Sequence, residues 1–496
     1  MTACAEIVGV VGAGVMGRGV AQLFAQSGQV VRLFDAKPGA AQAARDFALQ
    51  MIDRQARKGA LDAAKAASAA ERLIAVEALE DLSSSTVVIE AIIEDLAAKQ
   101  DVLGQLETVV APTTILASNT SSLTISAIAA GRKNPARIAG LHFFNPAPLM
   151  KVVEVIPGLR TAPETTARLS ALVRLTGHVP VTAADQPGFL INHAGRALYT
   201  EGFRILEEGV ADHAAVDRVV RESCGFRMGP FELLDLTGLD VSGAVMNSIY
   251  AQFQHDPRYR PSSLIGPRVA AGLFGQKTGE GFYVYADGLR RDVPEPEPPP
   301  ARAGKVWLAG EDAALAARLE ASGARIAASC EDADVVLVQP WGQDVATVVA
   351  ARDLPAERTV ALDPMIPPER RQVLMTSPAT TPEAVSLAHG WLAAGGCAVS
   401  VIADSPGFIA QRVLAMIVNT GCEIAQRAIA APAGIDAAVR IGLGYPMGPL
   451  ELGDAIGPHR IHEILLQMQA ATGDPRYRPS LWLRRRALLG QSLTRL

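Results

Sequence analysis

Short apolar runs and longer stretches of helical periodicity alternate along the first part of the chain, positions 1–186. The apolar runs are rich in β-branched residues, which is typical of buried strands. They lie at Ile7–Val11, Val30–Phe34, 87–93, 114–117, 137–141 and 152–156. The stretches between them, such as 96–110, carry apolar residues at the spacing of one helical face. Strands that alternate with helices predict βαβ units in a mostly parallel sheet, and the long segment 39–80 predicts an inserted pair of helices.

The pattern then changes. Across 187–283 no strand-like run occurs, and Leu190, Ala194 and Leu198 recur at every fourth position on one helical face. We therefore expect an all-α domain in this part of the chain. The segment 294–300 (PEPEPPP) follows it, and this composition predicts an extended, polyproline-type linker.

After the linker the helical part of the chain returns. The motif DQPGF at 185–189 reappears as DSPGF at 404–408. MGPFEL at 228–233 reappears at the same spacing as MGPLEL at 447–452, and DPRYRPS occurs at both 256–262 and 474–480. Because these matches fall almost in one register, they predict that the helical domain is duplicated.

Composition narrows the class of protein. The chain has 496 residues, of which 49% are hydrophobic and 20% charged, as in a soluble globular protein of about three domains. No apolar run reaches the roughly 18 residues of a membrane span, and the net charge of −5 disfavours a nucleic acid partner. The five cysteines, Cys4 among them, are scattered, which indicates a reducing compartment and no zinc site. No basic segment precedes the first apolar stretch, so we expect no signal peptide.

A glycine fingerprint follows the first predicted strand. Gly12, Gly14 and Gly17 fit G-x-G-x-x-G, with Val15 and Met16 between the last two glycines. In a dinucleotide-binding turn, the first glycine makes the tight turn, the second lets the backbone approach the pyrophosphate, and the third packs helix against strand. The N-terminus of the following helix then supplies N–H donors to the phosphates. The sequence therefore predicts that these residues bind a dinucleotide.

Asp35 ends the second predicted strand, the next one along the chain after the fingerprint. A carboxylate at this place accepts hydrogen bonds from the ribose hydroxyls and repels a 2′-phosphate. This favours NAD over NADP. The alternative for Asp35 is a helix cap, and the fingerprint alone also permits FAD.

Three further features point to chemistry at the carboxyl ends of the strands. The polar cluster SNTSS at 118–122 follows one predicted strand, where open α/β sheets bind ligands. His142 lies in GLHFFNP, and Glu154 lies inside the apolar strand 152–156. A carboxylate inside an apolar strand is costly unless it is paired. Pairing His142 with Glu154 explains both residues, because a carboxylate on one imidazole nitrogen fixes the tautomer and raises the basicity of the other.

The order and spacing of these motifs resemble those of the 3-hydroxyacyl-CoA dehydrogenase family. The motifs that carry the resemblance are GAGVMG, VIEAIIED, SNTSS, GLHFFNP, VEVI, DQPGFLIN, MGPFEL and KTGEGFY. The resemblance covers residues 5–285. Residues 305–490 resemble the second, degenerate copy that a longer bacterial variant of the family carries.

The resemblance implies roles for individual residues. His142 would be the general base and Glu154 its orienting partner, while Ser121 and Asn192 would hold the 3-oxygen and the thioester region of the substrate. The positions that would lie along NAD, in addition to the fingerprint and Asp35, are Glu94, Lys99, Asn119, Asn145 and Lys277. The sequence departs from the family pattern at His193, where an arginine is usual.

The second half lacks these motifs. Strand-like runs at 305–309, 334–338 and 359–362 predict a shortened α/β domain, but no G-x-G-x-x-G, SNTSS or HFFNP occurs there. In the register of the repeat, Gln411 corresponds to Asn192. We therefore expect one active site per chain. Shorter members of the family pair through their helical domains, so the resemblance implies either a homodimer or a pseudo-dimer within one chain.

These observations define an expected fold class: a Rossmann-type α/β NAD-binding domain followed by an all-α domain, with a second half that repeats a degenerate α/β segment and the α domain. The expected segments are 1–186 (NAD-binding), 187–285 (helical), 286–304 (linker), 305–403 (degenerate α/β) and 404–496 (second helical copy).

The resemblance implies NAD-dependent oxidation of an L-3-hydroxyacyl-CoA to the 3-oxoacyl-CoA, in the cytoplasm and without a metal. The acyl group would be short or dicarboxylic, such as 3-hydroxybutyryl or 3-hydroxyadipyl, in β-oxidation of fatty acids or in phenylacetate-type degradation of aromatic acids. Two alternatives stay open. One is a sugar-acid 3-dehydrogenase of the L-gulonate type, and the other is a non-catalytic, crystallin-like structural protein.

Overall fold

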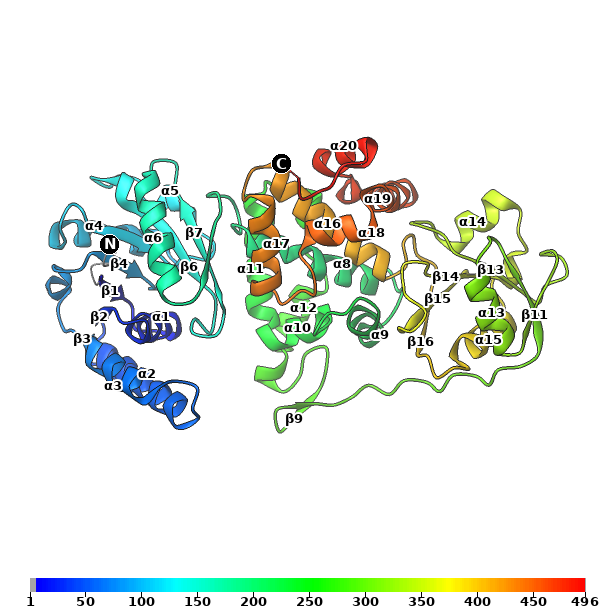
Figure 1. Ribbon diagram of the computed structural model, residues 1–496, viewed down its shortest axis with the longest axis horizontal. Helices are drawn as coiled ribbons and strands as arrows, with labels where there is room; N and C mark the ends of the chain where they lie inside the picture. The colour runs from blue at the N-terminus through cyan, green and yellow to red at the C-terminus, as the bar shows by residue number, and fades with distance from the viewer. Residues whose placement is uncertain (1–5, 496) are drawn as a thin grey trace. The chain divides into compact units, whose positions relative to one another are not determined.

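The computed structural model describes residues 6–495, so Cys4 lies outside the described residues. Contacts between residues divide the chain into two compact units. Unit 1 comprises the residues up to His193 together with Arg427–Leu443, and unit 2 comprises Ala194–Gln426 and the residues from Gly444 onward. Figure 1 shows the helices and strands of both units with their labels.

A parallel sheet with one antiparallel pair forms the centre of unit 1. Within the described residues its order is β3-β2-β1-β4-β5-β6-β7-β8, and only β6 and β7 run antiparallel. The strands are β1 (Ile7–Val11), β2 (Val30–Phe34), β3 (Leu73–Ala75), β4 (Val87–Glu90), β5 (Ile115–Ser118), β6 (Ile138–Phe143), β7 (Val152–Pro157) and β8 (Val179–Thr182). The strand order reverses between β1 and β4, which places the ligand crevice at the carboxyl ends of these strands.

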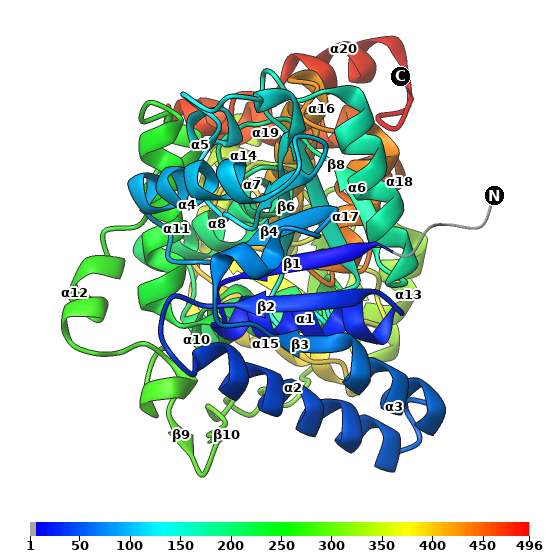
Figure 2. The same cartoon turned by 90° about the vertical axis from the view of Figure 1, so that its left-hand side faces the viewer.

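Helices bury the apolar side chains of this sheet. They are α1 (Val15–Gln26), α2 (Ala40–Arg57), α3 (Ala63–Arg72), α4 (Leu96–Val109), α5 (Ile125–Ile128), α6 (Pro163–Leu175), α7 (Ile191–Ala194) and α17 (Pro432–Gly442). Phe24 of α1 packs edge-on against Phe143 of β6, and both belong to one buried cluster with Leu33 and Leu169. Figure 2 shows α2 and α3 beside β2 and β3, so the predicted pair of inserted helices is present.

The sequence pattern was wrong by two or more residues at two strand ends of this sheet and missed two of its strands. The run 137–141 was expected to end before His142, but β6 continues to Phe143. The run 87–93 was expected to be one strand, but β4 ends at Glu90. The backbone turns there, because the Ile92 N–H donates to the Glu90 side chain (2.7 Å) and Asp95 caps the N-terminus of α4. The missed strands β3 and β8 are only three and four residues long. Such short segments carry little periodic signal.

Unit 2 contains most of both helical copies. The first copy forms α8 (Arg196–Glu207), α9 (His213–Arg218), a π-helical turn (Val219–Ser223), α10 (Pro230–Thr237), α11 (Leu239–Gln252) and α12 (Ile265–Ala270). The second copy contributes α16 (Ala410–Gln426), α18 (Pro449–Ile456), α19 (Pro458–Thr472) and α20 (Leu481–Leu489). Helix α16 is buried from Ala410 to Ala425 and packs against α8 of the first copy and against α18, α19 and α20. The two copies therefore share one core.

A second, smaller sheet also belongs to unit 2. Within the described residues its order is β12-β11-β13-β14-β15-β16, with β14 and β15 antiparallel. Its strands are β11 (Gly304–Leu308), β12 (Ala324–Ile326), β13 (Val335–Val338), β14 (Thr359–Leu362), β15 (Gln372–Thr376) and β16 (Val399–Ile402). Its helices are α13 (Ala313–Ala321), α14 (Val345–Arg352) and α15 (Pro382–Ala393). The pattern thus predicted three of its six strands.

The segment before this sheet is extended, as its proline content predicted. Residues 291–303 have no helix or strand, and Figure 1 shows them as a long strand-free connection after the hairpin β9 (Tyr285–Ala286) and β10 (Leu289–Arg290). The end of this segment is held in place, because the indole N–H of Trp391 donates to the Arg302 carbonyl oxygen (2.7 Å).

The expected fold class is confirmed. Unit 1 has the Rossmann-type sheet, and unit 2 has the helical region and the reduced second sheet. No helix in residues 6–495 is long and apolar enough to cross a membrane. The four cysteines in this range, Cys224, Cys330, Cys397 and Cys422, are free thiols.

Candidate active site

The glycine fingerprint forms the turn from β1 into α1. Gly12 has φ +100°, and a Cβ there would lie 2.5 Å from the Ala91 carbonyl oxygen. A Cβ on Gly17 would lie 1.8 Å from the Gly12 carbonyl oxygen, so neither position tolerates a side chain. Gly14 is different, because nothing lies within 4 Å of its Cβ position. That open side leaves room for a pyrophosphate, and no side chain caps the N–H groups at the start of α1.

Asp35 lies beside this turn at the end of β2. Its Oδ2 accepts the Ala13 N–H (2.7 Å), and its Oδ1 accepts the Lys37 N–H (2.8 Å). Each carboxylate oxygen has a second lone pair available for a ribose hydroxyl. The N-cap of α2 is Gly39, so the helix-cap alternative for Asp35 is wrong. The carboxylate holds the fingerprint turn, and this fits an NAD ribose.

Asp35 gives a prediction about cofactor choice. The wild type should use NAD far better than NADP. Asp35→Ala should lower the ratio of kcat/KM for NAD to kcat/KM for NADP by about tenfold or more. The reason is that repulsion between the carboxylate and the 2′-phosphate at about 4 Å amounts to roughly 1–4 kcal/mol. Steady-state kinetics with both cofactors measure the ratio. Asp53→Ala, which removes an exposed acid from α2, serves as the matched control. Equal use of NADP by the wild type would contradict the assignment.

A buried ion pair lies beneath the cofactor edge of the sheet. Glu90, the last residue of β4, accepts the Lys99 ammonium at 2.7 Å and the Ser118 hydroxyl at 2.6 Å. The side chains of Glu90 and Lys99 are each 1% exposed. Lys99 was predicted to lie along NAD, but its ammonium is enclosed here between Glu90 and Glu94, the latter 3.3 Å away.

Glu90 is a residue that the sequence analysis missed. The signal that identified Glu154, a carboxylate in an apolar strand, also applies to Glu90 within the VVIE strand. Its carboxylate links β4, α4 and the end of β5. We infer that Glu90 fixes the backbone on which the polar cluster 118–122 stands.

Glu94 organises that polar cluster. One carboxylate oxygen accepts the Thr120 hydroxyl, the Ser121 N–H and both the N–H and the hydroxyl of Ser122, at 2.7–2.9 Å. Burial alone would raise the pKa of Glu94. The hydrogen bonds from Thr120 and Ser122 and the charge of Lys99 outweigh burial and hold the pKa below its usual range. Glu94 is therefore an anion that positions the exposed Ser121.

Asn119 connects this cluster to the strand that carries His142. Its side-chain oxygen accepts the Phe143 N–H at 2.8 Å, and its own N–H donates to the Glu90 carbonyl oxygen at 2.8 Å. Asn119 is 8% exposed. These two bonds hold the end of β5 against β6 and β4 respectively, so the polar cluster and His142 share one rigid edge.

His142 and Glu154 face each other across the antiparallel pair β6 and β7. Nδ1 of His142 lies 2.6 Å from Oε2 of Glu154, and their exposed fractions are 3% and 0%. A carboxylate only accepts, so Nδ1 carries the hydrogen, and in the neutral imidazole Nε2 has the free lone pair. The other carboxylate oxygen accepts the N–H groups of Leu190 (2.9 Å) and Ile191 (2.8 Å). The pairing that the sequence predicted is present.

The segment 188–192 brings these N–H donors to Glu154. Gly188 (φ +71°) and Phe189 (φ +47°) turn the chain directly before Leu190. Asn192 follows in α7 and is half-buried. The Phe189 ring and the Phe144 ring flank the His142 imidazole, with centroids 5.8 and 4.4 Å away. These rings contribute to the burial of the imidazole.

Two predicted cofactor residues, Asn145 and Lys277, lie outside the polar cluster and the fingerprint turn. Asn145 is exposed, two residues after the end of β6, in a cis Asn145–Pro146 peptide. Lys277 belongs to unit 2, where its ammonium lies 2.6 Å from a carboxylate oxygen of Asp240. Its role toward NAD stays a prediction.

Two family models match this chain, and together they cover about three quarters of it. The NAD-binding domain of 3-hydroxyacyl-CoA dehydrogenase matches residues 7–186, and the C-terminal domain of the same enzyme matches 188–285 and again 407–493. The chain belongs to the 3-hydroxyacyl-CoA dehydrogenase family. The predicted resemblance is thus confirmed.

Individual relatives agree with this membership. The chain is 37% identical to 3-hydroxyadipyl-CoA dehydrogenase of Escherichia coli K12 over 98% of each chain. The solved structure of 3-hydroxybutyryl-CoA dehydrogenase from Escherichia coli K12 matches with a TM-score of 0.87, 35% identity and coverage of 98% and 99%. The 3-hydroxybutyryl-CoA dehydrogenase of Clostridioides difficile is 37% identical and covers 56% of this chain and 98% of its own. The protein is an NAD-dependent oxidoreductase that acts on 3-hydroxyacyl-CoA, as the sequence predicted.

The α/β region of the second half can be aligned with the NAD-binding region through a shared helix cap. Asp185 caps α5 through the N–H groups of Ile125 and Ser126, and Asp404 caps α14 in the same way. This match aligns β13 with β5 and the antiparallel pair β14–β15 with β6–β7. Each element of the second α/β region therefore has a counterpart in the first.

In this register none of the proposed catalytic groups recurs. Asp363 takes the place of His142, and it lies opposite Val373, which takes the place of Glu154. Gln411, the counterpart of Asn192, donates to Asp363 (2.8 Å) and accepts the Gly342 N–H (2.7 Å). Burial raises the pKa of Asp363 to about 6. This region has no imidazole–carboxylate pair among its described residues, which supports one active site per dehydrogenase chain.

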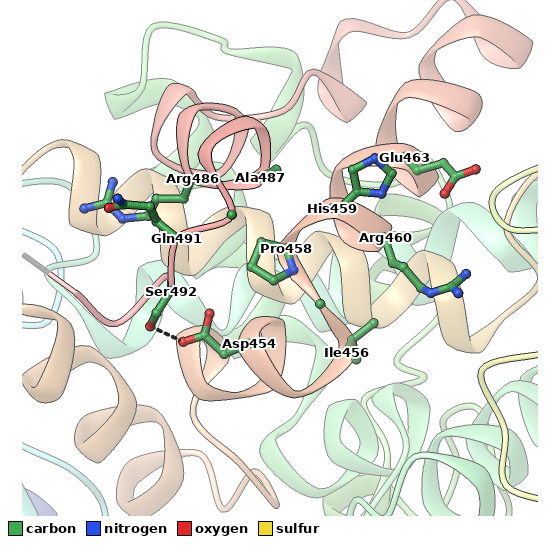
Figure 3. Close-up of a pocket in the computed structure, with 12 residues that line it drawn as sticks. Asp454, Ile456, Pro458, His459, Arg460, Glu463, Arg486, Ala487, Gln491 and Ser492 are labelled. Carbon is green, nitrogen blue, oxygen red and sulfur yellow. Dashed lines mark hydrogen bonds between the residues drawn. The ribbon is translucent and has the colours of Figure 1, made fainter.

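A large cavity belongs to the second helical copy. It measures about 700 Å³, and all of its lining residues lie between 454 and 492 (Figure 3). Figure 3 shows His459 and Arg486 at its wall and a hydrogen bond from Ser492 to Asp454 (2.5 Å). None of the predicted site residues lines it. Across residues 6–495, no group of three or more His, Cys, Asp or Glu is placed to hold a metal ion.

Proposed function

We propose that His142 is the general base of the dehydrogenase reaction and that Glu154 orients it. The observation that carries this proposal is the buried contact of 2.6 Å between His142 Nδ1 and Glu154 Oε2, in which both carboxylate oxygens have donors. A fixed tautomer leaves Nε2 as the acceptor for the proton of the 3-hydroxyl group.

The proposed step moves one proton and one hydride ion. Nε2 of His142 takes the proton of the substrate 3-hydroxyl as the C3–H bond breaks and the C3–O double bond forms. NAD, when bound, supplies the acceptor for the hydride that leaves C3. The charge of Glu154 stabilises the imidazolium that results. In the opposite direction His142 returns the proton to the 3-oxygen.

We further propose that Ser121 and Asn192 hold the substrate. Ser121 is exposed in the cluster that Glu94 positions, and Asn192 is one residue beyond the N–H donor that binds Glu154. Both side chains therefore stand on backbone that is fixed to the His142–Glu154 pair. Ser121 would bind the 3-oxygen, and Asn192 would bind the thioester region.

We propose that NAD is bound by Gly12, Gly14, Val15, Met16, Gly17, Asp35, Glu94, Asn119 and Asn145, which follow the same edge of the sheet in unit 1. Lys99 would act through Glu94, and Lys277 of unit 2 is proposed from the family resemblance alone. Val15 and Ile93 expose 55% and 71% of their surface near this edge. Apolar side chains that open to water at the start of α1 and after β4 suit contact with a cofactor.

We propose that the acyl group is short or dicarboxylic, as in 3-hydroxybutyryl-CoA or 3-hydroxyadipyl-CoA. The full-length relatives from Escherichia coli bear both names. A comparison of kcat/KM for the two substrates and for a long unbranched 3-hydroxyacyl-CoA tests the proposal. We expect either of the first two to exceed the long substrate by about tenfold or more, the usual scale of discrimination by pocket size. Preference for the long substrate would overturn it.

The organisation and context of the enzyme are part of the proposal. We propose the five segments 1–186, 187–285, 286–304, 305–403 and 404–496, and a pseudo-dimer of the two helical copies, which the packing of α16 on α8 supports. A cytoplasmic location and a place in fatty-acid or phenylacetate-type degradation follow from the family resemblance. No nucleic acid or membrane partner is proposed.

A further inference from the structure

One helix of the second copy packs in unit 1. By sequence, α17 belongs to the repeat that begins at residue 404, yet it lies against β7 and β8 of the first sheet. The Ala184 N–H, just after β8, donates to the Ile429 carbonyl oxygen (2.7 Å), just before α17. A Cβ on Gly434 would lie 3.3 Å from Val181 of β8. The helix is thus seated directly on the half of the sheet that carries Glu154.

The last residue of this helix, Gly442, makes the closest approach. A Cβ there would lie 2.7 Å from Cδ1 of Ile191 and 3.0 Å from Cγ1 of Val152. Both neighbours are buried, with exposed fractions of 1% and 0%. The φ of Gly442 is not positive, so the backbone itself would accept another residue. Glycine is needed here because Ile191 is close.

Ile191 is also one of the two N–H donors to Glu154. The contacts therefore run from Gly442 to the Ile191 side chain, from the Ile191 N–H to Glu154, and from Glu154 to His142. A shift of Ile191 would move a donor of Glu154 and turn the carboxylate that orients the imidazole.

A corresponding contact joins the first helical copy to the second α/β region. In the register of the repeat, Ser223 corresponds to Gly442, and the Ser223 hydroxyl donates to the Arg371 carbonyl oxygen (2.7 Å). Arg371 corresponds to Val152 in the same register. In both halves, the end of this helical segment therefore contacts the start of the antiparallel strand in the other α/β region. Only the contact of Gly442 lies beside an imidazole–carboxylate pair in the described residues.

We propose that the second helical copy, which lacks the catalytic groups, acts as a positioning element for the first active site, and that Gly442 of α17 is its positioning residue. The inference rests on the proposed roles of His142 and Glu154. It assigns a function in catalysis to the half of the chain whose own site has lost its catalytic pair.

The test compares Gly442→Ala with Gly434→Ala in the full-length enzyme. Gly442→Ala should lower kcat by about ten- to a hundredfold, because a displacement near 1 Å at a reacting group costs up to about 10²-fold. The KM for the acyl-CoA and the affinity for NADH should stay within about twofold, and the pH profile of kcat should shift, since the imidazole–carboxylate contact changes. Gly434→Ala, on the same helix but facing β8, should leave kcat near the wild-type value.

A compensating change separates positioning from a loss of folding. Ile191→Val removes the Cδ1 methyl group that the new Cβ would meet, so Gly442→Ala with Ile191→Val should recover most of kcat. Equal kcat for the two glycine variants, or a loss that Ile191→Val does not relieve, would overturn the inference.

A double-variant comparison distinguishes this inference from the proposed function. In the His142→Gln background, Gly442→Ala should cause no further loss of kcat, because the group that it positions is gone. If His142→Gln itself retains normal turnover, the proposed function fails. If His142→Gln is inactive while Gly442→Ala equals the wild type, only the positioning role fails.

Discussion

Replacing His142 with glutamine is expected to lower kcat by about 10²–10⁴-fold, the usual contribution of a positioned general base. Glutamine has nearly the same reach and can donate its amide N–H to Glu154, so the buried carboxylate keeps a partner. It cannot accept and then release a proton at neutral pH. The affinity for NADH, measured by fluorescence titration, should change little, because the fingerprint turn and Asp35 follow β1 and β2, whereas His142 lies in β6.

The second sheet offers a matched control for this variant. Asp363→Asn changes the residue that stands in the register of His142 and keeps its size, and Gln411 still has a side chain to bond. Its kcat should equal that of the wild type. Normal turnover in His142→Gln would remove this residue from the mechanism. A comparable loss in Asp363→Asn would show that the second α/β region takes part in the chemistry.

Glu154→Gln should lower kcat by about 10²-fold, within the contribution of the base that it orients. The amide oxygen can still accept the Leu190 and Ile191 N–H groups, so the local backbone should hold. The negative charge beside Nδ1 is lost, and with it the stabilisation of the imidazolium. The kcat and KM values, measured from NADH absorbance, should show the loss in kcat and little change in KM.

The two substitutions should not act independently. Because Glu154 works through His142, the double variant should lose much less than the product of the two single losses. A double-variant cycle on kcat measures this coupling, and melting temperatures show whether each variant is folded. Multiplicative losses would mean that Glu154 contributes to catalysis by another route.

Much of the active-site geometry was predictable from local pattern and the cost of burying charge. The fingerprint was recognisable because each of its glycines is required for a different steric reason. In the structure, a Cβ at Gly12 or Gly17 would collide with the backbone. His142 and Glu154 were paired on the argument that neither belongs alone in an apolar environment. The same argument applied to Glu90 would have found its partner Lys99, since both are buried and bonded.

The parts that were missed depend on contacts between distant segments. No local pattern indicates that α17, which comes from the second half of the chain, packs on β7 from the first half. The repeat itself shows that two helical copies exist, but it does not show which copy lies on which sheet. Strand β3 was missed because so short a segment carries no periodicity, and its pairing with β2 comes from the packing of α2 and α3.

The change at His193 also becomes interpretable through the repeat. The family pattern usually has arginine there, and the second copy carries Arg412 at the matching position. Arg412 is buried and lies 2.7 Å from both Glu201 and Glu208. The second copy therefore keeps the arginine. Arg412 lies in α16, which packs against α8, and it contributes to the shared core of unit 2.

The measurement that tests the central claim most directly is the NADH absorbance of the full-length wild type with acetoacetyl-CoA, with L-gulonate and NAD measured in parallel. We predict consumption of NADH that depends on acetoacetyl-CoA, much slower consumption of NADPH, and no NADH formation from L-gulonate. Oxidation of L-gulonate without reduction of acetoacetyl-CoA would contradict the account in favour of a sugar-acid dehydrogenase. Turnover of neither substrate by the folded protein would contradict it in favour of a structural role.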